Sequence, residues 1–551
     1  MWYHAPMPEP HEPQLEPCAG QAIAEPALPL GRPGWDALLL AVLLLARLRI
    51  NTLAEAGLFE HFQNVTGHSL LGRILSDQAE AAFGPWFGDP IALVLAALSL
   101  AALLIYLVVD LAGADRAGQQ RPASAPVGQD AAGSVGDRPE PPVVVGDRGP
   151  SRRDRPERLR VKTLLVWLII VLTVLLPTLK LALLRHENLP HSYSHDGGVL
   201  QTEAAIDFFL SGRNPYVEDY RDTAMADWGL PEFRTALDHY PYLPWTFVFS
   251  APVKLLSDAV LGWYDQRFVY LGVFVVALIL AVRLAPASRP RWRLALLMLL
   301  GLNPIMGLDL LFGQNDLFIW AWIVLALALL SRTFVIYNPQ FTVHSSQFII
   351  HHSSFWLPSL AFGLACASKP TAWFLSPFFA LLLARDQIGS WRDIPRAIPT
   401  MLRRGWPALA AFAVLMGPYL LWNANAMIDD VWRWAAGSAE THYQIWGWGA
   451  SNFVLAFGGL ASRFDRWPFW VLEVAVALPL LLWLGGRQAR HNTIAAACWH
   501  YALLLFGFLY VSRFMNENYL GYILAFLALG YFIVQDQPIQ HSPAKPPSEP
   551  A

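Results

Sequence analysis

Residues 161–198 read VKTLLVWLIIVLTVLLPTLKLALLRHENLPHSYSHDGG. The stretch is strongly apolar as far as about Leu184. It then becomes a polar loop in which Asp196 stands between His195 and two glycines. The apolar part is long enough to cross a hydrocarbon core of roughly 30 Å as an α-helix. It therefore predicts a membrane-spanning helix that leads directly into an acidic loop.

Similar apolar runs recur along the chain of 551 residues, of which 55% are hydrophobic and only 15% are charged. A soluble protein carries about 25% charged residues. The alternative of a soluble all-α protein fits this composition poorly. We therefore expect an all-α polytopic integral membrane protein.

Composition and motifs also exclude several functions. The net charge of −3 gives no indication of a nucleic-acid partner, and the three cysteines are too scattered for a disulfide framework or a metal site. The sequence holds no nucleotide-binding Gly-rich loop and no zinc motif, and residues 186–240 hold no Asp-x-Asp arrangement. This argues against a nucleotide-sugar enzyme of the usual soluble type. We predict no cofactor, although the acidic loop could hold a divalent cation.

Composition divides the chain into five parts. The first and last are rich in Pro and predicted to be disordered, and the third, rich in Ala, Gly, Pro, Arg and Asp, is typical of a flexible linker. The parts are a tail at 1–33, a pair of membrane helices at 34–111 (with apolar segments Trp35–Ile50 and Ile91–Leu111), a linker at 112–160, a transmembrane core at 161–534 and a second tail at 535–551.

Basic residues predict the orientation of the core. A cluster of arginines precedes the helix that begins at Val161, so that helix begins in the cytoplasm and the Asp196 loop lies outside. Residues 241–257 are apolar but interrupted by prolines, and we expect a short helix near the interface that belongs to an outer loop at 186–257. The expected core spans are roughly 161–185, 266–284, 294–311, 314–331, 356–368, 371–384, 406–425, 467–485, 493–511 and 518–534.

This topology, with both ends of the core in the cytoplasm, places several polar motifs on the outer face. They are joined there by a Trp-rich loop at 426–466. Ionisable groups at membrane depth are costly and usually mark a site. The motifs are the Asp196 loop, Gln314-Asn315-Asp316, Ser368-Lys369-Pro370-Thr371 and Ser512 to Tyr519.

Asp196 has two interpretations that the spacing does not separate. The two following glycines allow a sharp bend and a close approach of a ligand, so the carboxylate could act as a general base on a hydroxyl or bind a cation. An Asp before an apolar-periodic run is equally typical of a helix N-cap.

Two basic residues are candidate phosphate ligands. Lys369 is the only charged residue in an otherwise uncharged hairpin from Trp356 to Ala384, which favours phosphate binding over a snorkelling lysine. Arg513 could bind a phosphate bidentately.

The remaining candidates would bind substrate as hydrogen-bonding or aromatic groups. Gln314, Asn315 and Asp316 could be helix caps or could bind a sugar. The carboxylate of Glu517 could interact favourably with the positive N-terminal end of the last helix. The tyrosines are interpreted equally well as interfacial anchors or as walls of a binding site. These candidates are His195, Tyr216, Tyr240, Tyr242, Gln314, Asn315, Asp316 and Glu517.

In the order of these motifs, residues 161–534 resemble the GT-C superfamily of membrane glycosyltransferases. They resemble most of all glycosyltransferase family 87 and related polyprenyl-phosphate-mannose-dependent mannosyltransferases. The chain departs from this pattern at Tyr240-Pro241-Tyr242, where many relatives have Tyr-Pro-Pro, and at Asn516-Glu517, where many have His-Glu. The motifs in order are Asp196-Gly197, Ser211 to Tyr216, Tyr240 to Pro244, Gly313 to Asp316 and Ser368 to Thr371.

The resemblance implies a multi-pass cell-membrane enzyme that transfers a hexose, as an inverting reaction, from a polyprenyl-phosphate donor to a lipid or glycan acceptor outside the cell. Mannose is the implied hexose, Asp196 the implied base and Lys369 the implied phosphate ligand. A transporter or lipid flippase is the alternative, and a scaffold protein a further one. A transporter would need internal repeats and polar groups near mid-membrane.

Overall fold

The computed structural model describes residues 34–54, 90–118, 156–187, 194–227, 235–336 and 355–533. The tails predicted at 1–33 and 535–551, and residues 119–155 of the predicted linker, lie outside these ranges. The first residues of that linker, as far as Gly118, continue a helix.

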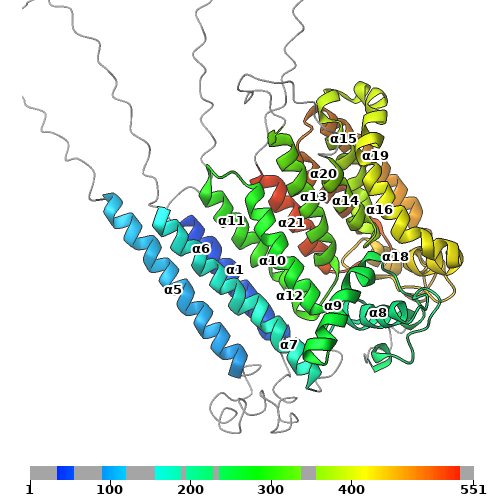
Figure 1. Ribbon diagram of the computed structural model, residues 1–551, viewed down its shortest axis with the longest axis horizontal. Helices are drawn as coiled ribbons and strands as arrows, with labels where there is room; N and C mark the ends of the chain where they lie inside the picture. The colour runs from blue at the N-terminus through cyan, green and yellow to red at the C-terminus, as the bar shows by residue number, and fades with distance from the viewer. Residues whose placement is uncertain are drawn as a thin grey trace, which may run out of the picture.

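The described residues form an all-α bundle (Figure 1). The elements of its first half are α1 (Trp35–Ala54), α5 (Pro90–Gly118), α6 (Pro156–Ile170), η2 (Val171–Leu175), α7 (Leu176–His186), η4 (Asp196–Gln201), α8 (Thr202–Leu210), η5 (Ala224–Asp227), α9 (Trp245–Leu261), α10 (Arg267–Leu284), α11 (Pro290–Gly301) and α12 (Pro304–Phe312).

In the second half, two very short strands pair in parallel, Trp446 opposite Phe514. The elements are α13 (Asp316–Ile336), α14 (Trp356–Cys366), η9 (Pro370–Leu375), α15 (Ser376–Leu383), η10 (Arg385–Gln387), η11 (Trp391–Asp393), α16 (Ile394–Ile428), η12 (Asp429–Arg433), α17 (Trp434–Ala436), β1 (Trp446–Gly447), α18 (Ser451–Phe457), α19 (Phe469–Arg490), α20 (Ile494–Val511), β2 (Phe514–Met515) and α21 (Asn518–Phe532).

Among the described residues, 7 helices are long and apolar enough to cross a membrane, or up to 8 if the bent pair α11–α12 is one span. The predicted class, a polytopic helical membrane protein, is confirmed. The predicted single helix at 294–311 is instead two helices bent by 47°. Asn303 produces this bend because its side chain accepts from the backbone N–H groups of Ile305 and Met306 and so starts a new helix at Pro304.

The first core helix is interrupted in a different way. Pro177 has no backbone N–H to donate to the carbonyl of Thr173, four residues earlier. The chain passes through the π-helical turn η2 at this place. The freed carbonyl of Thr173 accepts from Asn51 at 2.7 Å and from Arg47 at 3.2 Å, both on α1.

The N-terminal helices share the hydrophobic core of the remaining helices. Leu40 and Leu44 of α1 and Tyr106 of α5 are buried in the same cluster as Ile169 and Met306. At one end of these helices Lys162 pairs with Asp36 at 2.7 Å and also with Asp110. The pair of helices is therefore a wall of the bundle.

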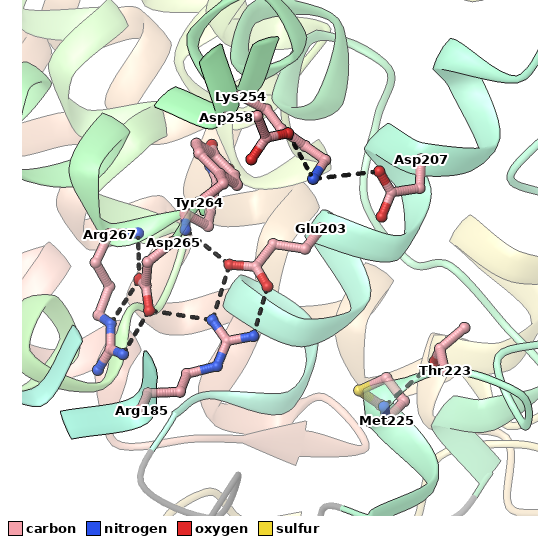
Figure 2. A network of polar contacts seen from close by, with 11 residues as sticks. Arg185, Glu203, Asp207, Thr223, Met225, Lys254, Asp258, Tyr264, Asp265 and Arg267 are labelled. Atoms are coloured by element: carbon pink, nitrogen blue, oxygen red, sulfur yellow. Dashed lines mark hydrogen bonds and ion pairs between the residues drawn. The ribbon is translucent and has the colours of Figure 1, made fainter. Parts of the chain in front are cut away.

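The outer loop is fastened to the bundle by a buried ionic network, which Figure 2 shows. Arg185, at the end of α7, contacts Glu203 of α8 at 2.6 Å and Asp265 at 3.1 Å. Asp265 in turn accepts from Arg267 at the start of α10 at 2.7 Å. Because every charge in this network has an opposite partner, it holds α8 against α7 and α10.

We expect Glu203→Gln to lower the free energy of unfolding by roughly 3 kcal/mol, because it leaves a buried guanidinium short of a carboxylate. The matched control is Asp207→Asn, one turn later on α8, where the side chain is 59% exposed and its contact to Lys254 is 3.4 Å. Thermal unfolding in detergent measures both variants. Equal melting temperatures for the two would contradict this role of Glu203.

Candidate active site

The Asp196 turn is held by its neighbours on both sides. The Nδ1 atom of His195 accepts from the backbone N–H of Gly198 at 2.8 Å, so His195, rather than Asp196, caps η4. The backbone N–H of His195 donates to the carbonyl of Phe312 at 2.6 Å. The interpretation of Asp196 as the cap is therefore wrong, and its carboxylate, 3.2 Å from His195 Nδ1, remains partly exposed at 17% of its side-chain surface.

The two glycines after Asp196 allow a close approach to other segments. A Cβ atom at Gly197 would lie 2.3 Å from the hydroxyl of Tyr242, and one at Gly198 would lie 2.1 Å from the carbonyl oxygen of Gly313. The hydroxyl of Tyr270 also donates to the carbonyl of Gly198 at 2.6 Å. Only glycine fits at these two positions, and the close neighbours are Tyr242 and Gly313 of the protein itself, whereas the sequence suggested the approach of a ligand.

Lys369 lies where three helices begin. Its ammonium donates to Asp316 at 2.7 Å and to Asn315 at 3.2 Å, both at the start of α13. Asn518, at the start of α21, donates to the other oxygen of Asp316. Lys369 itself precedes η9. The candidates Lys369, Asn315 and Asp316 therefore form one buried cluster.

Tyr242 connects the Lys369 cluster to the Asp196 turn. Its ring centroid is 5.7 Å from the Lys369 ammonium, while its hydroxyl lies against Gly197. The ring of Tyr519 contacts the same ammonium at 5.1 Å. Two aromatic faces and a carboxylate thus hold the cation in place.

The electrostatics of His195 reflect the same convergence. Burial lowers the pKa of His195, the charge of Asp196 opposes this, and the charge of Lys369 adds to it. The neutral imidazole also fits the hydrogen bond, because an unprotonated Nδ1 is needed to accept from Gly198.

Asn516 and Glu517 lie beside this cluster, before α21. Asn516 donates to the hydroxyl of Tyr443 at 3.4 Å, and the charge of Asp196 acts on Tyr443. Glu517 is exposed. Gln314 is half-buried, and its backbone N–H donates to the carbonyl of Asp309 at 2.7 Å.

Arg513 supports a loop. It is 1% exposed, and its guanidinium donates to the backbone carbonyls of Tyr443, Asp465 and Arg463 at 2.6, 3.0 and 3.2 Å. Burial lowers the pKa of Arg513 to about 10, so it stays charged at neutral pH. This geometry gives Arg513 a structural role in place of the phosphate contact expected from the sequence.

Two of the predicted tyrosines belong to an aromatic core under the outer loop. Tyr216 is 3% exposed and donates to the carbonyl of Tyr242 at 2.7 Å, and Tyr240 is fully buried against it. They position Tyr242 from behind. Sequence reasoning placed neither Tyr270 nor Tyr443 at the site, because both lie in apolar or Trp-rich surroundings that carry no motif.

Among the described residues, no group of three or more His, Cys, Asp or Glu side chains could hold a metal ion.

Comparison with known proteins gives little beyond this geometry. No family model and no curated protein matches the chain. One solved structure that it is similar to is ArnT from Cupriavidus metallidurans bound to undecaprenyl phosphate, with 15% sequence identity and a TM-score of 0.35. The match covers 68% of this chain and 58% of that chain.

The cap hydrogen bond of His195 has a consequence for pH. Burial lowers the pKa of the His195 imidazole, so the folded protein binds a proton there less readily than the unfolded chain, in which histidine has a pKa of about 6.5. The contribution of the neutral imidazole to the free energy of unfolding is complete above that pH and is lost as the pH falls through the pKa of the folded state.

We therefore expect the difference in Tm between wild type and His195→Ala to shrink between about pH 8 and pH 5. His195→Asn, which keeps an acceptor but does not titrate, controls for other groups. A difference that stays constant or grows as the pH falls would exclude this role of the imidazole.

Proposed function

We propose that this protein is a membrane glycosyltransferase that uses a polyprenyl-phosphate-linked sugar as its donor. The observation that carries the proposal is that Asp196 and Lys369 come together around Tyr242 and His195, at the ends of apolar helices. A lipid-linked donor suits this place, because its tail can lie in the membrane while its phosphate reaches the ends of the helices. It also needs no nucleotide-binding motif.

Lys369 binds the donor phosphate in this proposal. A lysine ammonium has three N–H donors. Among the described residues, Asp316 and Asn315 take two of them. The third is available for a phosphate oxygen. Asp316 fixes the ammonium, and the positive charge stabilises the leaving phosphate as its bond to the sugar breaks.

Asp196 acts as the general base. It takes the proton of the acceptor hydroxyl as that oxygen forms a bond to the anomeric carbon. The bond from that carbon to the phosphate oxygen breaks on the opposite side, and polyprenyl phosphate leaves with the electron pair. This single displacement inverts the anomeric carbon. The proposed sugar is a hexose, mannose by the resemblance, and the acceptor is a lipid or glycan.

The proposed orientation places this site on the extracytoplasmic face of the cell membrane. Arg291, in the first turn of α11, lies at the end of the bundle that holds Lys162, because its charge acts on Asp36 there. The Asp196 turn follows the other end of α7. Basic residues favour the cytoplasmic side, which supports an external site.

A transporter or flippase is the second candidate, and a transfer assay separates it from the enzyme. We expect purified protein in liposomes to move radiolabel from polyprenyl-phosphate mannose to an acceptor glycan or lipid. Other polyprenyl-phosphate hexoses test the choice of sugar. Movement of labelled lipid between leaflets without transfer would favour the transporter.

We expect Asp196→Asn to lower transfer by at least about 10²-fold, which is the smallest contribution usual for a general base. The fold should be retained, since the cap hydrogen bond belongs to His195. Asp219→Asn, an exposed carboxylate of the same outer loop, is the matched control. Full activity of the Asp196 variant would remove it as the base.

A further inference from the structure

Arg47 lies in an unusual place for an arginine. It comes from α1, outside the part of the chain that resembles glycosyltransferases, and its side chain is completely buried. A buried charge in a membrane protein is costly and needs strong compensation. Arg49, two residues further on the same helix, is exposed and provides a natural comparison.

The guanidinium of Arg47 joins two interrupted helices. It donates to the carbonyl of Thr173 at 3.2 Å, which Pro177 leaves without its usual helical partner. It also donates to the carbonyls of Pro304 and Gly307 at 3.0 Å each, in the first turns of α12. A fork of planar donors suits several carbonyls at once.

The fit around Arg47 is tight on the side of α12. A Cβ atom at Gly307 would lie 2.2 Å from Nη1 and 2.7 Å from Cζ of Arg47. Glycine at this position therefore lets the guanidinium reach the helix. The carboxylate of Asp309, on the same short helix, lies within electrostatic reach of Arg47, Lys369 and Asp316.

The far end of α12 holds the Asp196 turn. This helix has 9 residues, so its two ends lie only about two and a half turns apart. Its last carbonyl, on Phe312, accepts from the backbone N–H of His195 at 2.6 Å, and Gly313 directly after it lies against Gly198. A shift at the first turn of α12 is therefore passed to the residue that we propose as the base.

We infer that Arg47 is a positioning residue, which sets the place of α12 and through it the place of Asp196 relative to Lys369. In this way α1 contributes to the geometry of the site. The inference rests on the proposed function only where it concerns the effect of Arg47 on catalysis. The effect of Arg47 on the position of the Asp196 turn does not depend on the reaction.

The test compares Arg47→Gln with Arg49→Gln in full-length protein in lipid nanodiscs. Hydrogen exchange of peptides that cover residues 194–202 and 308–316 reports the two ends of the connection. We expect faster exchange in both segments for Arg47→Gln and wild-type exchange for Arg49→Gln. Equal exchange in the two variants would overturn the inference.

A second pair of variants tests the same contact without removing the charge. Gly307→Ala adds a methyl group against the guanidinium, whereas Gly272→Ala on α10 meets open space. We expect faster exchange at 194–202 for Gly307→Ala alone. If Arg47→Gln does not fold, this pair decides the question, and unchanged exchange in Gly307→Ala would overturn the inference.

Kinetics separates positioning from mere support of the fold. We expect Arg47→Gln to lower kcat by about 10- to 100-fold, because small misplacement of a catalytic group costs this much. Arg47→Lys should restore part of kcat, because it keeps a cationic donor at this position. A loss of yield with unchanged kcat would assign Arg47 to folding only. If wild type shows no transfer, the proposed function fails while the exchange measurements still test Arg47.

Discussion

Within a bilayer each backbone N–H and C=O group needs a partner from the protein, and much of this structure follows from that constraint. A straight helix satisfies it alone, but a helix interrupted by proline leaves a carbonyl free. The carbonyl of Thr173 is such a group, and Arg47 and Asn51 of another helix supply its donors. The interruption of the first core helix and the insertion of α1 into the bundle are thus parts of one solution.

The breaks between helices also explain where the candidate site lies. Asp196, Lys369 and Asp316 each stand at or just before the start of a helix or helical turn, as does Asn518. Helix starts of this kind bring polar side chains and backbone groups together between apolar surfaces. Because four such starts meet, a lysine and a carboxylate can pair at 2.7 Å between apolar helices. Their cost of burial is offset by that pairing and by the rings of Tyr242 and Tyr519.

The sequence predicts a good part of this arrangement, and physical reasons account for the rest. Apolar runs place the helices, and the distribution of arginines brings Asp196, Asp316 and Lys369 to one end of the bundle. What the sequence leaves undetermined are contacts made over long chain separations. Arg513 has the composition of a phosphate ligand, yet carbonyls some 48 to 70 residues away in the chain use its donors. The contacts of Arg47 could not be predicted for the same reason, because a lone arginine in an apolar run does not reveal which carbonyls accept its hydrogen bonds.

The proposed donor requires a cation at the site that is available to a phosphate. A lipid phosphate must meet a cation that it can reach and that still has a donor to offer. Lys369 meets this condition, because one carboxylate and one amide hold it while a lysine has a third N–H group. Arg513 meets it less well, because it is 1% exposed and three backbone carbonyls fix its guanidinium. The choice between the two cations is therefore decided by their partners, and it favours the one that shares Tyr242 with Asp196.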